Sequence, residues 1–94
     1  MNIKDKTIVI TGAARGLGAA MAKRLAGHQP VLALVDMKAD DLAATAEACR
    51  QAGARVECFA ANVAVEADVI RLFDEIVAQC GSVDALVNNA GITR

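Results

Sequence analysis

The sequence lacks an excess of charge of either sign, and it lacks long hydrophobic runs. Its ten basic and eleven acidic residues are interspersed and leave a net charge of −1, which gives no indication of a nucleic-acid-binding surface. Alanine supplies much of the apolar content, in runs of only a few positions, and the N-terminus has no signal-peptide core. We therefore expect a cytoplasmic protein that binds neither membranes nor nucleic acid.

Cysteine and histidine are too few and too scattered for a metal centre or a disulfide framework. Cys49, Cys58 and Cys80 show no CxxC spacing and no histidine neighbour, and their number is odd. We expect them to be buried, reduced thiols. The single histidine, His28, lies between two periodic segments and is expected to be a loop residue.

Strands and helices alternate along the chain, whose 94 residues allow one domain at most. Short apolar runs predict strands, and helical spacing of apolar residues predicts helices between them. We expect strands over 7–11, 31–35, 55–63 and 84–88, and helices after the first glycine loop, from Asp40 or Asp41 to about Gln51, and from about Glu66 to Cys80. Successive right-handed βαβ units predict a Rossmann-like, doubly wound α/β fold with a parallel sheet in the order 3-2-1-4.

Each expected helix carries an apolar face and ends near a glycine. The face consists of Leu17, Met21 and Leu25 in the first helix, of Leu42, Ala46 and Cys49 in the second, and of Val69, Ile70, Phe73, Ile76, Val77 and Cys80 in the third. Gly27, Gly53 and Gly81 are the expected helix ends.

A glycine-rich loop, TGAARGLG over residues 11–18, joins the first strand to the first helix. A strand end followed at once by a helix start presents free backbone N–H groups and the positive end of the helix dipole, which attract phosphate. Gly12 permits a sharp turn, Gly16 lets the backbone approach a pyrophosphate, and Gly18 lets the helix pack closely on the sheet. The spacing differs from G-x-G-x-x-G and from the P-loop, so the loop alone is also compatible with a structural turn.

Asp36 ends the second strand, 18 residues after Gly18. At this place a carboxylate can accept hydrogen bonds from the 2′- and 3′-hydroxyls of an adenosine ribose, whereas a 2′-phosphate would meet like charge. The position lies with the glycine loop at the carboxyl edge of the expected sheet, where such folds bind their ligands. The sequence therefore favours NAD(H).

The chain resembles the short-chain dehydrogenases/reductases. Residues 11–18 match the family's T-G-x-x-x-G-x-G motif, and Asn88-Asn89-Ala90-Gly91 matches its N-N-A-G motif. The resemblance covers essentially the whole chain. Within the family, the sequence looks most like the 3-oxoacyl-[acyl carrier protein] reductase and 3-hydroxyacyl dehydrogenase group.

The resemblance implies a set of cofactor-binding residues. In the family the glycine loop holds the pyrophosphate, and an Asp-Val pair at the end of the third strand contacts adenine. Here that pair is Asn62-Val63, which keeps a hydrogen-bonding carbonyl but loses the charge. Asn88 and Thr11 are expected to brace neighbouring strands. The expected cofactor-binding residues are Gly12, Ala14, Arg15, Gly16, Leu17, Gly18, Asp36, Met37, Asn62, Val63, Asn89, Ala90 and Gly91.

Arg15, by contrast, points to NADP(H) as the cofactor. In many relatives a basic residue at this position meets the 2′-phosphate of NADP(H). Met37 follows Asp36, so the carboxylate has no directly adjacent cation, although Lys38 is close. On these electrostatic grounds NAD(H) is favoured and NADP(H) stays open, and Arg15 as a solvated loop residue is an equal alternative.

The family's catalytic tyrosine has no counterpart in this sequence, which has no tyrosine and a single serine, Ser82. We therefore expect residues 1–94 to be the N-terminal part of one dinucleotide-binding domain in a protein of about 250 residues, inactive alone. The family implies an NAD(P)-dependent oxidoreductase, a homotetramer, acting on a small-molecule or acyl-carrier-bound carbonyl substrate. A non-catalytic dinucleotide-binding regulatory module and a ligand-free structural domain are the alternatives.

Overall fold

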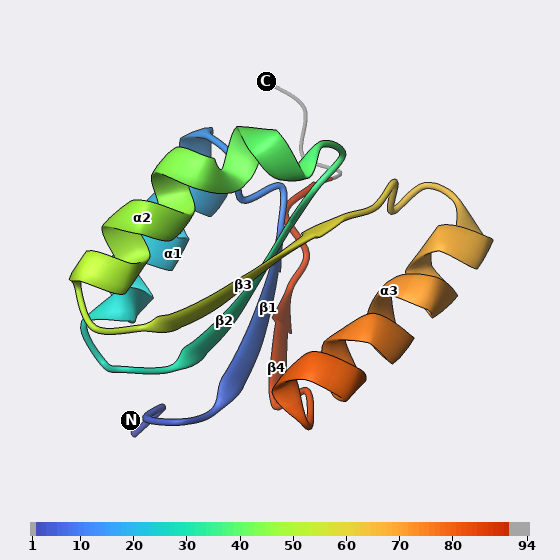
Figure 1. Ribbon diagram of the computed structural model, residues 1–94. Helices are drawn as coiled ribbons and strands as arrows, with labels where there is room; N and C mark the ends of the chain where they lie inside the picture. The colour runs from blue at the N-terminus through green and yellow to red at the C-terminus, as the bar shows by residue number, and fades with distance from the viewer. Residues whose placement is uncertain (1, 91–94) are drawn as a thin grey trace.

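Four parallel strands form one sheet in the predicted order, β3-β2-β1-β4 (Figure 1). The computed structural model describes residues 2–90. The strands are β1 (Thr7–Thr11), β2 (Val31–Asp36), β3 (Arg55–Ala60) and β4 (Ala85–Val87). Val9 of β1 lies opposite Ala33 of β2 and Leu86 of β4. Because all four strands run in the same direction, their carboxyl ends meet at one edge of the sheet.

Helices cover both faces of this sheet (Figure 1). On one face lie α1 (Gly16–Ala26) and α2 (Ala43–Gln51), and on the other lies α3 (Glu66–Cys80). A short 3-10 helix, η1 (Ala39–Leu42), leads into α2. This is the Rossmann-like α/β fold that the sequence predicts. Within residues 2–90, no helix combines the length and apolar character needed to cross a bilayer.

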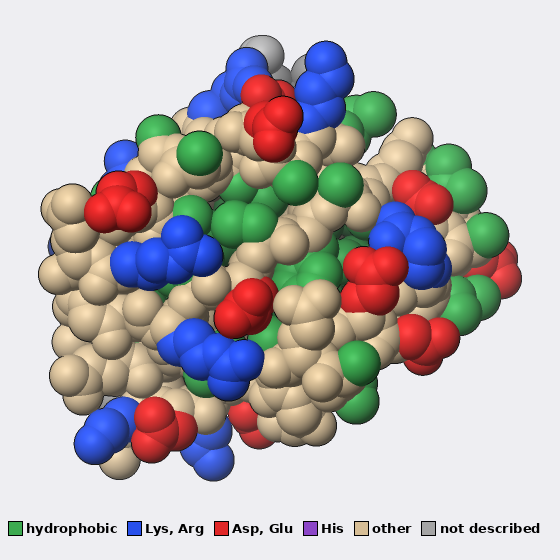
Figure 2. Space-filling view, in the orientation of Figure 1, with side chains coloured by type: hydrophobic (Ala, Val, Ile, Leu, Met, Phe, Trp, Pro, Cys, Tyr) green, Lys and Arg blue, Asp and Glu red, His purple; other side chains and the backbone are tan. Residues whose placement is uncertain are grey.

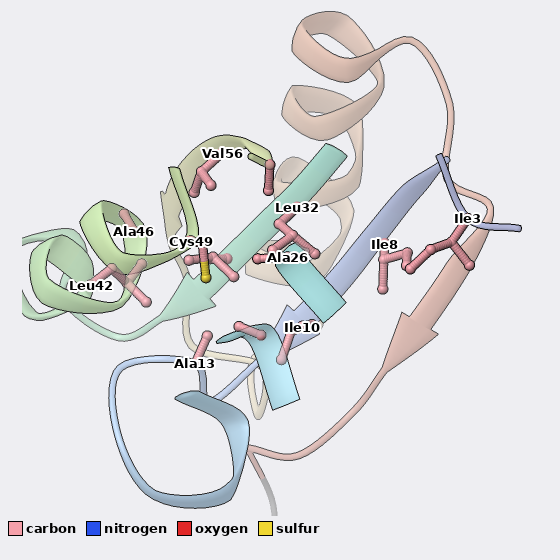
Figure 3. Packing of buried hydrophobic residues seen from close by; sticks show 13 residues of the cluster. Ile3, Ile8, Ile10, Ala13, Ala26, Leu32, Leu42, Ala46, Cys49 and Val56 are labelled. Carbon is pink, nitrogen blue, oxygen red and sulfur yellow. The ribbon is translucent and has the colours of Figure 1, made fainter. Parts of the chain in front are cut away.

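Alternate residues of the strands enter two separate cores. The core beneath α1 and α2 includes Ile10 and Leu32, and Figure 3 shows Ala26 of α1 and Cys49 of α2 close to that leucine. The core beneath α3 contains Val9, Ala33, Val35, Phe59, Ala61, Leu72 and Ile76. Since both of their faces are covered, the central strands β1 and β2 form almost continuous apolar runs. On the face seen in Figure 2, acidic and basic side chains are interspersed rather than gathered by sign.

The face of α1 that contacts the sheet matches the predicted one only in part. Leu17 is 59% exposed, and the alanines at positions 19, 22 and 26 are buried instead. The start of α1 approaches the end of β1 so closely that a Cβ at Gly18 would lie 2.1 Å from the Gly12 carbonyl oxygen. Only small side chains fit beneath the start of a helix held at that distance, so the prediction was wrong for Leu17. Leu25, near the other end of α1, is partly buried and packs against the core as predicted.

Helix α3 has the predicted bounds, but two of its predicted core residues lie at the surface. Ile70 is 58% exposed and Val77 is 50% exposed. Leu72, which the predicted face omitted, is fully buried beside Ile76. The apolar surface of α3 is wider than the stripe that contacts the sheet, so spacing alone did not select the buried residues.

The start of the second helical segment also differs from the prediction. Neither Asp40 nor Asp41 caps it through a side chain, because the turn η1 begins before them with Lys38 as its N-cap. Its end is as predicted, with Gly53 at a φ of 113°. The N–H of Ala54 then bonds to the Cys49 carbonyl over 3.1 Å, which closes the helix in a Schellman motif.

Candidate cofactor-binding site

A cleft follows the carboxyl edge of the sheet in two parts. One part, of about 400 Å³, lies at the ends of β2 and β3, between Met37 and Val63. The other, of about 390 Å³, lies over the glycine loop. Gly12, Asp36 and Ala90 line both parts. The two parts are therefore adjacent, and the cleft is elongated.

The structure brings most of the predicted site residues to this cleft. The predicted residues that line the cleft are Gly12, Arg15, Gly16, Leu17, Asp36, Met37, Asn62, Val63, Asn89 and Ala90. Ala14 and Gly18 do not line it, because Ala14 packs against the core and Gly18 is buried behind the loop. Gly91 lies outside the described residues. Ligand binding by these residues stays a prediction.

Gly16 and Gly18 differ in what their missing side chains allow. A Cβ at Gly18 would meet the Gly12 carbonyl oxygen at 2.1 Å and the Asn89 Nδ2 atom at 2.9 Å, so that glycine is required for packing. At Gly16, apart from its chain neighbours and its own helix backbone, no atom of residues 2–90 lies within 4 Å of an ideal Cβ, and the backbone has a φ of 58°. Gly16 therefore leaves an open cradle on the side of the cleft.

The amino end of α1 faces this cradle without a protein cap. Its N-cap residue, Arg15, makes no side-chain capping hydrogen bond, and the first turn contains no acidic residue. The first N–H groups of a helix have no acceptor within the helix, and the helix dipole makes this end positive. An anion of phosphate size fits this arrangement of free N–H groups and open space.

The carboxylate of Asp36 is fixed at the junction of the two parts of the cleft. Its Oδ2 atom accepts a hydrogen bond from the Ala14 N–H (3.0 Å), and its Oδ1 atom accepts one from the Met37 N–H (2.8 Å). An ionised carboxylate has about four acceptor positions, so each oxygen keeps capacity for a ligand hydroxyl. Asp36 can therefore hold the glycine loop and accept ligand hydrogen bonds together.

Arg15 lies on the rim and faces a second carboxylate. Its Nη2 atom is 3.5 Å from Asp41 Oδ2, and the two side chains are 80% and 43% exposed. Such an exposed ion pair contributes little to stability, about 0–1 kcal/mol. It still places a negative charge beside the cation that could otherwise meet a 2′-phosphate. No motif in the sequence indicated Asp41 as the partner of Arg15.

The ends of β1 and β4 are joined by one side chain. The Thr11 hydroxyl donates to Asn88 Oδ1 (2.9 Å), and its oxygen accepts the N–H groups of Asn89 (2.9 Å) and Ala90 (3.1 Å). Asn89 also donates through Nδ2 to the Gly12 carbonyl, at 3.4 Å. Its Oδ1 atom is buried and has no hydrogen-bond partner within residues 2–90. The N-N-A segment is thus tied to both the strand and the loop.

Two side chains of α3 hydrogen-bond to the backbone that forms the wall of the cleft beside β3. β3 ends at Ala60, three residues before the predicted end, because the backbone N–H of Asn62 turns to donate to Asp68 Oδ2 (2.9 Å). Arg71 donates to the Ala60 carbonyl over 2.9 Å. From the sequence, Asp68 and Arg71 were placed only on the outer faces of α3. Their i, i+3 spacing did not indicate that they hold the segment at Asn62 and Val63.

The thiols lie away from the cleft. Cys49 is buried, and Cys58 and Cys80 are partly buried, all three as free cysteines. Burial raises the pKa of each of these thiols above its ordinary value. Raised thiol pKa values do not favour nucleophilic or metal-binding roles. Over residues 2–90 there is no group of three side chains suited to hold a metal ion.

The parallel sheet, the glycine cradle at a helix start and the carboxylate at the end of β2 define a doubly wound, Rossmann-like α/β protein. A family model described as short chain dehydrogenase matches residues 6–94. The chain belongs to this family, which confirms the resemblance seen in the sequence.

Individual relatives carry different names. The 3-oxoacyl-[acyl-carrier-protein] reductase of Staphylococcus epidermidis is 39% identical over 92 residues, which are 96% of this chain and 37% of that protein. Among solved structures, an NAD+-bound xylitol dehydrogenase is 33% identical with a TM-score of 0.91, covering 98% of this chain and 35% of that chain. A metagenomic short-chain oxidoreductase in complex with NADP is 29% identical with a TM-score of 0.91, covering 98% and 42%. The chain spans about a third of the length of the curated relatives it matches.

Proposed function

We propose that this chain is the cofactor-binding part of an NAD(P)-dependent oxidoreductase that interconverts a carbonyl and a hydroxyl group. The observation that carries the proposal is the uncapped amino end of α1 beside the open cradle at Gly16, with Asp36 at the adjoining part of the cleft. A small-molecule or acyl-carrier-bound substrate, as in a 3-oxoacyl-[acyl-carrier-protein] reductase, is the proposed substrate class. The named reductase relative supports it.

The two parts of the cleft suit the two halves of a dinucleotide. The free N–H groups at the start of α1 would hold the pyrophosphate, and Asp36 would accept the hydroxyls of the adenosine ribose. Asn62 and Val63 would line the adenine end, Asn89 the opposite end, and Ala90 the junction between them. The bound cofactor would supply or accept the hydride. The chain's own residues would bind and orient it.

NAD(H) is the proposed cofactor, with NADP(H) as the alternative. A 2′-phosphate on the adenosine ribose would approach the carboxylate of Asp36, and Asp41 pairs with the one rim cation of the glycine loop, Arg15. Both charges oppose an added phosphate. The NAD+-bound and NADP-bound family structures show that this fold accommodates either cofactor.

The proton donor for the carbonyl oxygen is not among the residues of this cleft. Reduction of a carbonyl requires an acid at that oxygen, and the family's donor, a tyrosine, does not occur in the sequence. We therefore propose that the catalytic groups belong to a longer protein, and that residues 1–94 alone bind the cofactor without turnover. A cytoplasmic homotetramer is part of the same proposal.

Calorimetric titration with NADH and with NADPH tests this function. We expect binding of at least one of them, and a melting temperature that rises with its concentration. Gly16→Asp should weaken binding at least tenfold, since it places a carboxylate in the phosphate cradle.

The control is Gly27→Asp, at the opposite end of α1, where a Cβ also has no atom of another described element within 4 Å, although the backbone there has a helical φ of −64°. This variant should bind like the wild type. A folded wild-type protein that bound neither nucleotide at saturating concentration would refute the proposed function.

A further inference from the structure

Ala14, in the middle of the glycine loop, is held at both of its backbone polar groups by residues from other elements. Its N–H donates to Asp36 Oδ2 (3.0 Å) at the end of β2. Its carbonyl oxygen accepts a hydrogen bond from the hydroxyl of Thr45 (3.3 Å) in α2. The loop is therefore fixed from the sheet and from the neighbouring helix.

Thr45 is a buried polar residue on an otherwise apolar helix face. Its exposed fraction is 2%, and Ala46 and Cys49 beside it are buried in the core. A buried hydroxyl costs free energy unless it forms a hydrogen bond, and a helical threonine commonly bonds to a carbonyl of its own preceding turn. Thr45 instead donates to the glycine loop, so its hydroxyl serves a contact between two elements.

The direction of the Ala14 carbonyl determines the direction of the next N–H group. No described peptide bond is cis, and in a trans peptide the C=O and the following N–H point in opposite directions. By accepting from Thr45, the Ala14 carbonyl points toward α2, and the N–H of Arg15 points away from it. Arg15 is the N-cap of α1, at the start of the free N–H groups described above.

We propose that Thr45 is a positioning residue for pyrophosphate binding, acting with Asp36 through Ala14. Asp36 then has two roles, since it orients the phosphate loop and accepts the ribose hydroxyls. Thr45 lies outside the lining of the cleft and acts only through the loop. This inference rests on the proposed function, because it assumes that the loop binds a pyrophosphate.

The test compares a ligand that contains the pyrophosphate with one that lacks it. Binding of ADP-ribose is measured by calorimetry and binding of adenosine by competition, for the wild type, Thr45→Val and Thr45→Ser. Thr45→Val keeps the side-chain shape and removes the hydroxyl, and we expect it to weaken ADP-ribose binding about three- to tenfold. Adenosine binding should change by less than about twofold, and Thr45→Ser should restore ADP-ribose binding.

Thr7→Val is the matched control. Thr7 is equally buried, at 2% exposure, but lies at the amino end of β1, at the edge of the sheet away from the cleft. The Thr7→Val variant should bind ADP-ribose and adenosine like the wild type. This result would show that the effect of Thr45→Val comes from the lost contact with the loop and not from the loss of a buried hydroxyl in general.

Three results would overturn the proposal. The first is wild-type ADP-ribose binding by Thr45→Val, and the second is an equal loss of ADP-ribose and adenosine binding. The third is failure of both Thr45→Val and Thr45→Ala to fold, which would assign the residue to the core rather than to the loop. Failure of the proposed function is distinguishable, because the wild type itself would then bind neither ADP-ribose nor NADH.

Discussion

The hydroxyl of Thr11 donates a 2.9 Å hydrogen bond to Asn88 Oδ1, although the two residues are 77 positions apart in the chain. The same oxygen accepts the backbone N–H groups of Asn89 and Ala90. One side chain at the end of β1 thus orients three consecutive residues after β4. This gives a physical reason for a threonine before the glycine loop and an asparagine after β4: each satisfies the other across adjacent parallel strands.

Thr11→Val should destabilise the folded state. The substitution preserves shape but leaves the partly buried N–H groups of Asn89 and Ala90 without their acceptor, at a cost of up to about 1–3 kcal/mol for each group. We expect the free energy of unfolding, measured by urea denaturation, to fall by about 2–4 kcal/mol. Thr11→Ser keeps the oxygen and should lose less than about 1 kcal/mol. Equal stabilities of the two variants would contradict this account.

Gly18→Ala should be strongly destabilising because the new methyl group meets backbone. Its Cβ would lie 2.1 Å from the oxygen and 2.8 Å from the carbon of the Gly12 carbonyl, which cannot rotate aside as a flexible side chain can. We expect a loss of about 3 kcal/mol in urea denaturation, at the upper end for overpacking. In the control, Gly27→Ala, the Cβ enters open space at a helical φ of −64°, and stability should be unchanged or slightly raised.

Cofactor preference should respond differently to two substitutions at Asp36. Asp36→Asn removes the charge and keeps one acceptor oxygen, so the ratio of NADPH to NADH affinity should rise about tenfold. Asp36→Ala also releases the Ala14 N–H, so it should weaken both cofactors and leave NADPH binding no tighter than in the wild type. Calorimetric dissociation constants measure both effects. Tighter NADPH binding by Asp36→Ala would show that the carboxylate does not support the loop.

Arg15 provides the opposite test of cofactor preference. Arg15→Gln removes the rim cation and should lower the ratio of NADPH to NADH affinity several-fold, since a guanidinium favours a 2′-phosphate. Asp41→Asn releases the same guanidinium from its 3.5 Å contact and should raise that ratio. If neither variant changed the ratio, Arg15 would be a solvated loop residue, the alternative that the sequence left open.

The strand order and most strand bounds followed from the sequence because a doubly wound sheet buries both faces. Runs such as 31–35 are apolar without interruption, and each is followed by a glycine, asparagine or aspartate that marks the edge. The helix faces were harder to predict. In α1 the backbone at Gly18 approaches the backbone of β1 so closely that alanines, not large side chains, are buried near it. The spacing of apolar residues in the sequence does not reveal how closely a helix approaches the sheet.

The residues that line the cleft could be predicted from the sequence, whereas the residues that hold them in place could not. Gly16 belongs to a motif because its positive φ favours glycine, and Asp36 was predicted from its place at the end of the second strand. Thr45 contacts the backbone of a loop 31 residues earlier in the chain, and Asp68 contacts the backbone of the loop before its own helix; both contacts depend on how the helices dock, which spacing does not reveal. Thr45 left one sequence signal, since a threonine three residues after Leu42 falls on the buried face of an alanine-rich helix.

The thiols predict a loss of stability at alkaline pH. Burial holds the pKa of Cys49, Cys58 and Cys80 above the ordinary value of 9.0 in the folded state. As pH rises, the unfolded chain therefore loses thiol protons before the folded chain does. The free energy of unfolding should be steady below about pH 8 and decline as pH rises through the folded-state pKa values, by at most about 1.4 kcal/mol per pH unit for each thiol.

The contribution of the thiols is separable because the sequence has no tyrosine, so no phenol titrates in the same range. Urea denaturation between pH 7 and 10, under a reductant, should show a steeper decline for the wild type than for a variant with all three cysteines replaced by alanine. Lysine titration is common to both proteins and cancels in the comparison. Cys49→Ala alone should remove part of the difference, because Cys49 is the fully buried thiol. If the free energy of unfolding fell equally with pH in the wild type and in the triple variant, burial would not raise the pKa of these thiols.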